Sequence, residues 1–162
     1  MYFDITNFGI MEKNNVIFQK IKKIVSKNEL LLLLIILLTV FLNWLAISGL
    51  NMLIIIIILT IAGFYFLTAF FNEKGVSVHQ KFLIQLSGLA SAMVLVGVLF
   101  SMLNWPSLIQ NLVIGGVGLI GVLVGGSVLG LVSTKYLPRN MVIRIVTLII
   151  LAAYFLMNDL LV

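Results

Sequence analysis

The sequence is dominated by one stretch, Phe82 to Thr134, that contains no Asp, Glu, Lys, Arg or His. The segment Leu103-Asn104-Trp105-Pro106 divides it into two apolar runs and holds one of the chain's two prolines. A bilayer-spanning helix needs about 20 predominantly apolar residues, and helices satisfy their own backbone hydrogen bonds in lipid. The stretch therefore predicts a hairpin of two transmembrane helices.

Composition extends this prediction to the whole chain. Of the 162 residues, 62% are hydrophobic and 9% are charged, and the mean hydropathy is +1.26. A soluble domain of this size could not bury so much apolar surface. The net charge of +5 does not indicate nucleic-acid binding, because the basic residues flank the apolar runs, which is the positive-inside pattern.

Five apolar runs predict an all-α, polytopic membrane helix bundle. The expected division is 1–29, an N-terminal cytoplasmic segment; 30–71, a first transmembrane hairpin; 72–81, a cytoplasmic loop; 82–132, a second, glycine-rich hairpin; 133–140, a cytoplasmic loop; and 141–162, a fifth transmembrane helix. The expected helices within the two hairpins are 30–47, 52–71, 82–103 and 108–132. Three capping boxes, Ser26-x-x-Glu29, Ser77-x-x-Gln80 and Ser107-x-x-Gln110, mark predicted helix starts.

The fifth run, 141–157, carries Arg144 one turn inside its start. An arginine there can extend its side chain to the membrane interface, so we expect a fifth span. A re-entrant or interfacial segment is the alternative. Arg144 is also a candidate for binding a lipid phosphate.

Charge distribution predicts the orientation. With the N-terminus in the cytoplasm, all ten basic residues fall on the inner side and Asp159 is the only charged residue outside. We expect an uncleaved anchor in a bacterial inner membrane. Residues 12–27 have helical periodicity, with Lys20, Lys23 and Lys27 among the lysines that lie largely opposite its apolar face. This segment either lies on the anionic leaflet, with these lysines at lipid headgroups, or only fixes the topology.

A short repeat supports two parallel hairpins. Leu42-Asn43-Trp44 recurs as Leu103-Asn104-Trp105, and both copies fall at predicted outer tips. Indole rings favour the headgroup boundary. The residues expected at the outer interface are Trp44, Asn104, Trp105 and Pro106.

Small residues predict the helix packing of the second hairpin. In 108–132, one glycine stripe is Gly118, Gly121 and Gly125, and the other is Gly115, Gly126 and Gly130. Each glycine costs up to ~1 kcal/mol of helix propensity relative to alanine, which close approach by neighbouring helices can offset. Two stripes predict two neighbours and a central position, and a glycine-lined pore is the alternative.

A matching face of the preceding helix comprises Ser87, Ala90, Val94, Gly97 and Ser101. Val117, Ile120, Val124, Val128 and Leu131 form an aliphatic ridge, expected to meet lipid.

Few residues suggest chemistry. There is no cysteine, and the single histidine, His79, is expected to be a solvated loop residue. No ionisable residue lies inside the first four predicted helices, whereas proton-coupled carriers need such a group. A catalytic nucleophile with its base and a metal-ligand set are also missing from the pattern. We therefore expect no catalytic residue, cofactor or metal.

Residues 87–106, with Gly88, Gly97, Leu99-Phe100 and Asn104-Trp105-Pro106, resemble the membrane hairpin of the gliding-motility motor subunit linked to type 9 secretion. The resemblance implies a shared hairpin architecture. Asn104 stands where that family usually has histidine, and residues 108–132 lack its buried glutamate, so the resemblance does not imply motor activity.

The sequence predicts an accessory or scaffolding subunit of a larger inner-membrane complex, which contacts another membrane protein or a second copy. A passive channel or facilitator for a small uncharged solute is the alternative.

Overall fold

The computed structural model describes residues 27–45, 49–70, 77–105, 108–128 and 139–161. They form five helices: α2 (Glu29–Trp44), α3 (Asn51–Ala69), α4 (Val78–Met102), α5 (Leu108–Val128) and α6 (Arg139–Leu161). The predicted all-α helix bundle is confirmed for these residues. The expected amphipathic helix at 12–27, with Lys20 and Lys23, lies outside the described residues except for Lys27.

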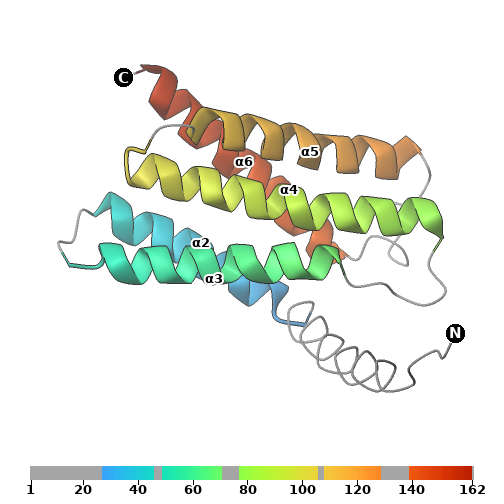
Figure 1. Ribbon diagram of the computed structural model, residues 1–162, viewed down its shortest axis with the longest axis horizontal. Coiled ribbons are helices and arrows are strands. Elements are labelled where there is room, and N and C mark those ends of the chain that lie inside the picture. The colour runs from blue at the N-terminus through green and yellow to red at the C-terminus, as the bar shows by residue number, and fades with distance from the viewer. Residues whose placement is uncertain (1–26, 46–48, 71–76, 106–107, 129–138, 162) are drawn as a thin grey trace, which may run out of the picture.

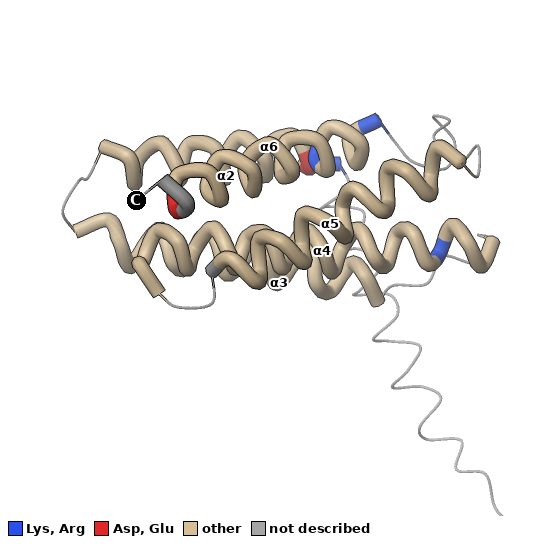
Figure 2. Tube along the Cα trace, turned by 90° about the horizontal axis from the view of Figure 1, so that it is seen from above, with Lys and Arg blue, Asp and Glu red and all other residues tan. Residues whose placement is uncertain are grey.

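The helices form two layers that run back and forth along the long axis of the molecule. α3, α4 and α5 lie side by side in one layer, and α2 and α6 cross behind them (Figure 1). In the view from above, α2 and α6 are stacked over the first layer (Figure 2). α4 packs against α3, α5 and α6, whereas α5 packs against α4 and α6. The prediction that 108–132 is the central helix is therefore wrong, and α4 is central.

Four helices, α3, α4, α5 and α6, are long and apolar enough to cross a membrane. α2 is equally apolar in character but has 16 residues, which at about 1.5 Å per residue is shorter than a hydrocarbon core of about 30 Å. The fifth apolar run is a full helix of 23 residues that begins with Arg139. This length favours a membrane-spanning helix and not a short re-entrant segment.

The helix starts agree only in part with the predicted capping boxes. Ser77 and Gln80 form a complete box, with the Gln80 N–H bonded to Ser77 Oγ and the Ser77 N–H bonded to Gln80 Oε1. α4 therefore begins at Val78, four residues earlier than predicted. The box at Glu29 is wrong: Glu29 is the first residue of α2, after Asn28, and its carboxylate bonds Arg144. Ser107 lies outside the described residues.

α4 ends in a Schellman motif at the tip of its hairpin with α5. The Asn104 N–H bonds the carbonyl of Ser101, and the Trp105 N–H bonds the carbonyl of Phe100. Asn104 adopts a φ of 52°, the left-handed conformation that this motif requires and that asparagine tolerates. The Trp105 ring packs 5.4 Å from that of Phe100. Trp44, Asn104 and Trp105 are mainly exposed, and Pro106 lies outside the described residues, so their place at the outer interface stays a prediction.

Candidate functional site

Four of the five described helices bring polar side chains together in the bundle interior. α2 contributes Glu29, α3 contributes Tyr65, α4 contributes Ser87 and α6 contributes Arg144. Their relative exposures are 4%, 0%, 0% and 6%. We call these four residues the polar cluster. Burying a charge in an apolar bundle is costly unless it is paired, so its contacts decide what it can do.

Arg144 is the hub of the polar cluster. Its Nη1 lies 2.7 Å from Oε1 of Glu29, and its Nη2 donates a hydrogen bond of 2.5 Å to Oγ of Ser87. The guanidinium carbon lies 4.6 Å from the centroid of the Tyr65 ring, a cation–π contact. One side chain of α6 thus bonds α2 and α4 and stacks on α3. This is the kind of planar, forked recognition that arginine provides and lysine does not.

Helix direction and one glycine explain why these residues meet. Glu29 opens α2, Tyr65 is one turn from the end of α3, and Arg144 is five residues into α6. Because successive helices alternate in direction, these positions fall at the same end of the bundle (Figure 1). At Gly88 an added Cβ would lie 2.8 Å from the Tyr65 carbonyl oxygen and 2.9 Å from the Cβ of Ala69. Gly88 therefore lets the end of α3 approach α4 beside Ser87.

The polar cluster has more donors than acceptors. A guanidinium carries five N–H donors and no acceptor. Within the described residues, Nε of Arg144 and the hydroxyl of Tyr65 are buried without a hydrogen-bond partner. Each such group costs about 1–3 kcal/mol relative to a satisfied one. The cluster therefore retains unused capacity to bind an acceptor.

Exposed basic residues surround this end of the molecule. Lys27 precedes α2, Lys81 lies in the first turn of α4, and Arg139 begins α6; Lys27 and Arg139 are exposed and Lys81 is partly exposed. Figure 2 shows the Lys and Arg positions at the end where α4 and α6 begin, and a separate acidic position close to the C-terminus. We call the end defined by Lys27, Lys81 and Arg139 the basic end.

One expectation about charge needs correction. Arg144 does not extend to the membrane interface, because its guanidinium turns inward to the Glu29 carboxylate. The first four predicted helices contain no ionisable residue, but the bundle interior still holds Glu29, just before the first of them, and Arg144 of the fifth run. The pairing is not evident from local sequence, because Glu29 also fits the position of a capping residue. The signal available was one acidic residue and one arginine, each at the edge of an apolar run.

The small-residue face of α4 is buried as predicted. Ser87, Ala90, Val94, Gly97 and Ser101 all lie inside the bundle. The contact with α5 is made by close approach of backbones, as small residues allow in membranes. An added Cβ at Gly97 would lie 2.9 Å from the Leu112 nitrogen, and one at Gly115 would lie 2.8 Å from the Val94 nitrogen. We call this contact the glycine seam.

The remaining glycines of α5 do not form the two predicted stripes. Gly118 meets the Cβ of Ala90, and Gly125 meets Leu83 at 3.3 Å, so both face α4 together with Gly115. Gly116 instead faces Ala152 of α6. Gly121 is exposed, and a Cβ added there would have nothing within 4 Å, so its assignment to internal packing is wrong. Gly126 is buried and Gly130 lies outside the described residues.

The outward side of α5 is apolar. Val117, Ile120, Val124 and Val128 are between 48% and 79% exposed, in agreement with the predicted aliphatic ridge; Leu131 lies outside the described residues. Gly121 lies between these side chains in the sequence and is also exposed. We call Val117, Ile120, Gly121, Val124 and Val128 the outer face of α5.

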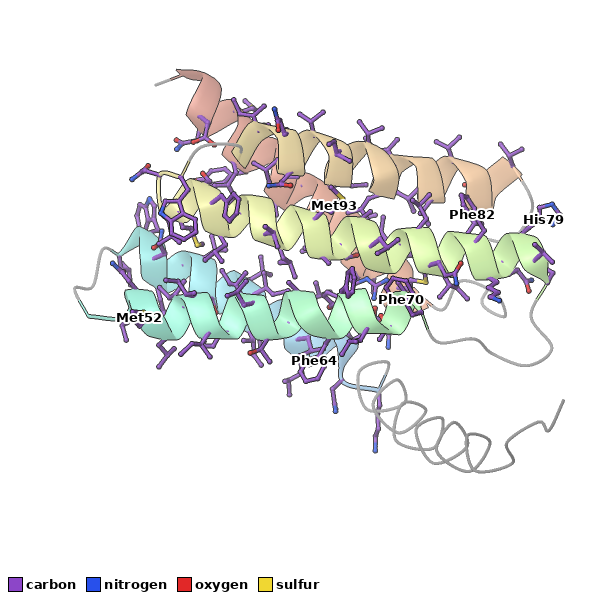
Figure 3. All side chains as sticks on the ribbon, viewed as in Figure 1. Met52, Phe64, Phe70, His79, Phe82 and Met93 are labelled. Carbon is purple, nitrogen blue, oxygen red and sulfur yellow. The ribbon has the colours of Figure 1, made fainter. Side chains whose placement is uncertain are left out.

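Two further polar residues lie near the ends of the bundle. Asp159 is half-buried, and its carboxylate accepts a hydrogen bond from Oγ of Ser101 at 3.1 Å. His79 lies in the first turn of α4 instead of a loop, with its side chain exposed at the basic end (Figure 3). Among the described residues there is no group of three or more His, Cys, Asp or Glu that could hold a metal ion.

Comparison with known proteins adds no relative. No family model, curated protein or solved structure significantly matches this chain. The resemblance of residues 87–106 to the gliding-motility hairpin stays a prediction. Function must therefore be inferred from the polar cluster, the glycine seam and the outer face of α5.

Proposed function

We propose that this protein is a non-enzymatic integral membrane protein, an accessory or scaffolding subunit that holds a helix of another membrane protein, or of a second copy, against the outer face of α5. The observation that carries this proposal is Gly121. This α5 glycine is exposed, and a Cβ added to it would have no atom of the described residues within 4 Å. A partner helix is expected to fill that space.

The argument rests on the energetics of glycine in helices. Glycine in a helix interior costs about 0.8–1 kcal/mol relative to alanine. At Gly115 and Gly118 the close contact with α4 offsets this cost inside the chain. Gly121 has no such contact within the described residues and is exposed, whereas Gly63 of α3, which also has open space, is partly buried by its own chain. Close approach from outside would therefore account for the glycine at position 121. Without side-chain atoms at this position, another backbone can pack tightly between Val117 and Val124.

The glycine seam also bears on the alternative of a solute facilitator. A path between α4 and α5 would need space at Gly97, Gly115 and Gly118, where backbone and side-chain atoms already lie within 3 Å of an added Cβ. This packing favours a scaffold over a facilitator that uses the α4–α5 contact.

The test compares complexes extracted in mild detergent from cells that express the full chain in two tagged forms. Gly121→Leu fills the gap on the outer face, while Gly121→Ala adds only one methyl group. Gly63→Leu is the matched control, because a Cβ at Gly63 of α3 also has nothing within 4 Å. We expect Gly121→Leu to shift the native complex to a smaller size, with Gly121→Ala intermediate and Gly63→Leu unchanged.

Pull-down between the two tags distinguishes a second copy from a different protein, which mass spectrometry of the complex would identify. If Gly121→Leu leaves the complex intact, or if Gly63→Leu disrupts it equally, the outer face of α5 is not the contact surface.

We further propose that the protein lies in the bacterial inner membrane with the basic end in the cytoplasm. The exposed Lys27 and Arg139 and the partly exposed Lys81 support this, because basic residues next to spans are retained inside. A reporter fused after Val162 should lie outside, and reporters fused at Gly75 or Lys135 should lie in the cytoplasm. A cytoplasmic Val162 fusion would contradict a fifth crossing.

A further inference from the structure

The polar cluster is not explained by stability alone. A buried ion pair is often no more stable than well-packed apolar residues of similar volume, because desolvation offsets the Coulombic attraction. Here the pair is also accompanied by two unpartnered buried polar atoms, Nε of Arg144 and the Tyr65 hydroxyl. Unsatisfied groups that persist in a native structure often mark a functional site, and ionisable residues within membrane segments do so by default.

We propose that Arg144, Ser87 and Tyr65 form a binding site for a phosphate group, and that the Glu29 carboxylate is an internal ligand that a phosphate can replace. A phosphate and a carboxylate share the acceptor geometry that a guanidinium binds through two parallel N–H groups. A phosphate offers more acceptor oxygens than a carboxylate. It can therefore accept from Arg144 and also from the Tyr65 hydroxyl, which has no well-formed hydrogen bond among the described residues.

The count of donors supports a negatively charged ligand over a neutral one. Arg144 uses Nη1 for Glu29 and Nη2 for Ser87, which leaves its Nε–H and the Tyr65 O–H as buried donors. Among the described residues, the cluster offers the guanidinium two acceptors, Oε1 of Glu29 and Oγ of Ser87. A ligand that complements the cluster must therefore supply acceptors.

The position of the cluster suits a phosphate at the membrane surface. Arg144 lies five residues after the exposed Arg139, which corresponds to about 7.5 Å along α6. Lys27, Lys81 and Arg139 at the basic end attract anions toward it. The phosphate could belong to an anionic lipid headgroup or be free phosphate, and both have the chemistry that the donors recognise.

Glu29 is placed so that its carboxylate can move away from Arg144. It is the first residue of α2, after an Asn28 that makes no side-chain capping bond. Beyond Glu29, α2 buries only Leu33, Ile36 and Thr39, all on one side. Movement of the first turn of α2 would therefore expose Arg144 while the rest of the helix stays packed.

The experiment measures binding to the purified full chain in detergent by native mass spectrometry and titration calorimetry. The probes are dioleoyl phosphatidic acid, inorganic phosphate, and dioleoyl phosphatidylcholine as a zwitterionic reference. We expect Glu29→Gln to bind phosphatidic acid about tenfold or more tightly than the unmodified chain, because the competing charge is removed. Asp159→Asn, which neutralises an acidic residue bonded to Ser101 at the other end of α4, should bind like the unmodified chain.

Arg144→Gln alone leaves Glu29 without its cation and could prevent folding, so the decisive variant is Glu29→Gln combined with Arg144→Gln. This double variant carries no buried charge at either position, and we expect it to lose the tighter binding. Arg139→Gln reports on surface attraction and should weaken binding only slightly. Binding of phosphatidic acid but not inorganic phosphate assigns the site to a lipid headgroup. Binding of both phosphatidic acid and inorganic phosphate assigns it to a free anion.

Three results would overturn the proposal. The first is equal binding by Glu29→Gln and the unmodified chain. The second is retention of the tighter binding by the double variant. The third is a loss in Arg139→Gln as large as that in the double variant, which would make surface charge the cause. None of these readouts depends on complex formation through α5.

Discussion

The glycine seam and the polar cluster hold α4 to its neighbours by opposite means. At the seam, Gly97 and Gly115 bring α4 and α5 together so closely that a methyl group has no room. At the polar cluster, Arg144 of α6 bonds Ser87 of the same helix and also contacts Glu29 of α2 and Tyr65 of α3. One contact depends on having no side chain, and the other depends on side chains whose partners are on different helices.

The two regions therefore fail differently when they are changed. The seam is local: its partners are consecutive helices, and each glycine has its own contact. The cluster is cooperative, because Arg144 contacts three helices and its removal leaves Glu29 buried without a counter-charge. Substitutions that distinguish local from cooperative loss test this comparison.

The largest effect is expected from Arg144→Met. Removing one partner of a buried pair leaves an uncompensated charge, which costs about 3–5 kcal/mol. Thermal unfolding in detergent should show a large drop in Tm and reduced accumulation in membranes. The control is Glu29→Leu combined with Arg144→Met, which should recover most of the loss because no charge remains buried. A double variant that is less stable than Arg144→Met would show that the two side chains do not act as a pair.

A smaller effect is expected at the seam. Gly115→Ala places a methyl group 2.8 Å from the Val94 backbone nitrogen, and such overpacking typically costs ~1–3 kcal/mol. Gly121→Ala has open space and should raise the stability of the isolated chain by up to ~1 kcal/mol. The same unfolding measurement compares the two. Equal destabilisation by both variants would contradict the assignment of Gly121 to the outer face.

How much of this could be read from the sequence differs between the two regions. The face of α4 from Ser87 to Ser101 follows from helical spacing alone, since residues three and four apart share a side. The outward position of Val117, Ile120, Val124 and Val128 follows in the same way. The neighbour of each α5 glycine could not be predicted in this way, because it depends on where α6 crosses α5: Gly116 faces Ala152 of α6, whereas Gly121 faces no described residue.

The polar cluster could not be predicted from local pattern. Glu29 and Arg144 belong to opposite ends of the chain, and each has a sufficient local explanation, as a helix cap or as an interfacial arginine. Their pairing depends on α2 and α6 lying together in the second layer, which is a tertiary property. The same holds for Asp159, which bonds Ser101 only because the ends of α4 and α6 coincide.

The smallest effect is expected from Ser101→Ala at the far end of α4. It removes the hydrogen bond to the half-buried Asp159 carboxylate, and we expect a loss of at most ~1 kcal/mol, since water can replace the serine hydroxyl there. Ser127→Ala is the matched control, because Ser127 is exposed and bonds only the Leu123 carbonyl of its own helix. A loss at Ser101 as large as that at Arg144 would show that both ends of α6 are equally critical.

The most direct test of the cooperative cluster is a charge exchange between its two ionised residues. Tm is measured in detergent for Glu29→Arg, for Arg144→Glu, and for the chain that carries both. Each single reversal places like charges together inside the bundle and should lower Tm strongly. The double exchange restores an opposite pair and should recover the larger part of that loss. If the Tm of the double exchange is no higher than that of the less stable single variant, α2 and α6 are not joined through this pair and the account is wrong.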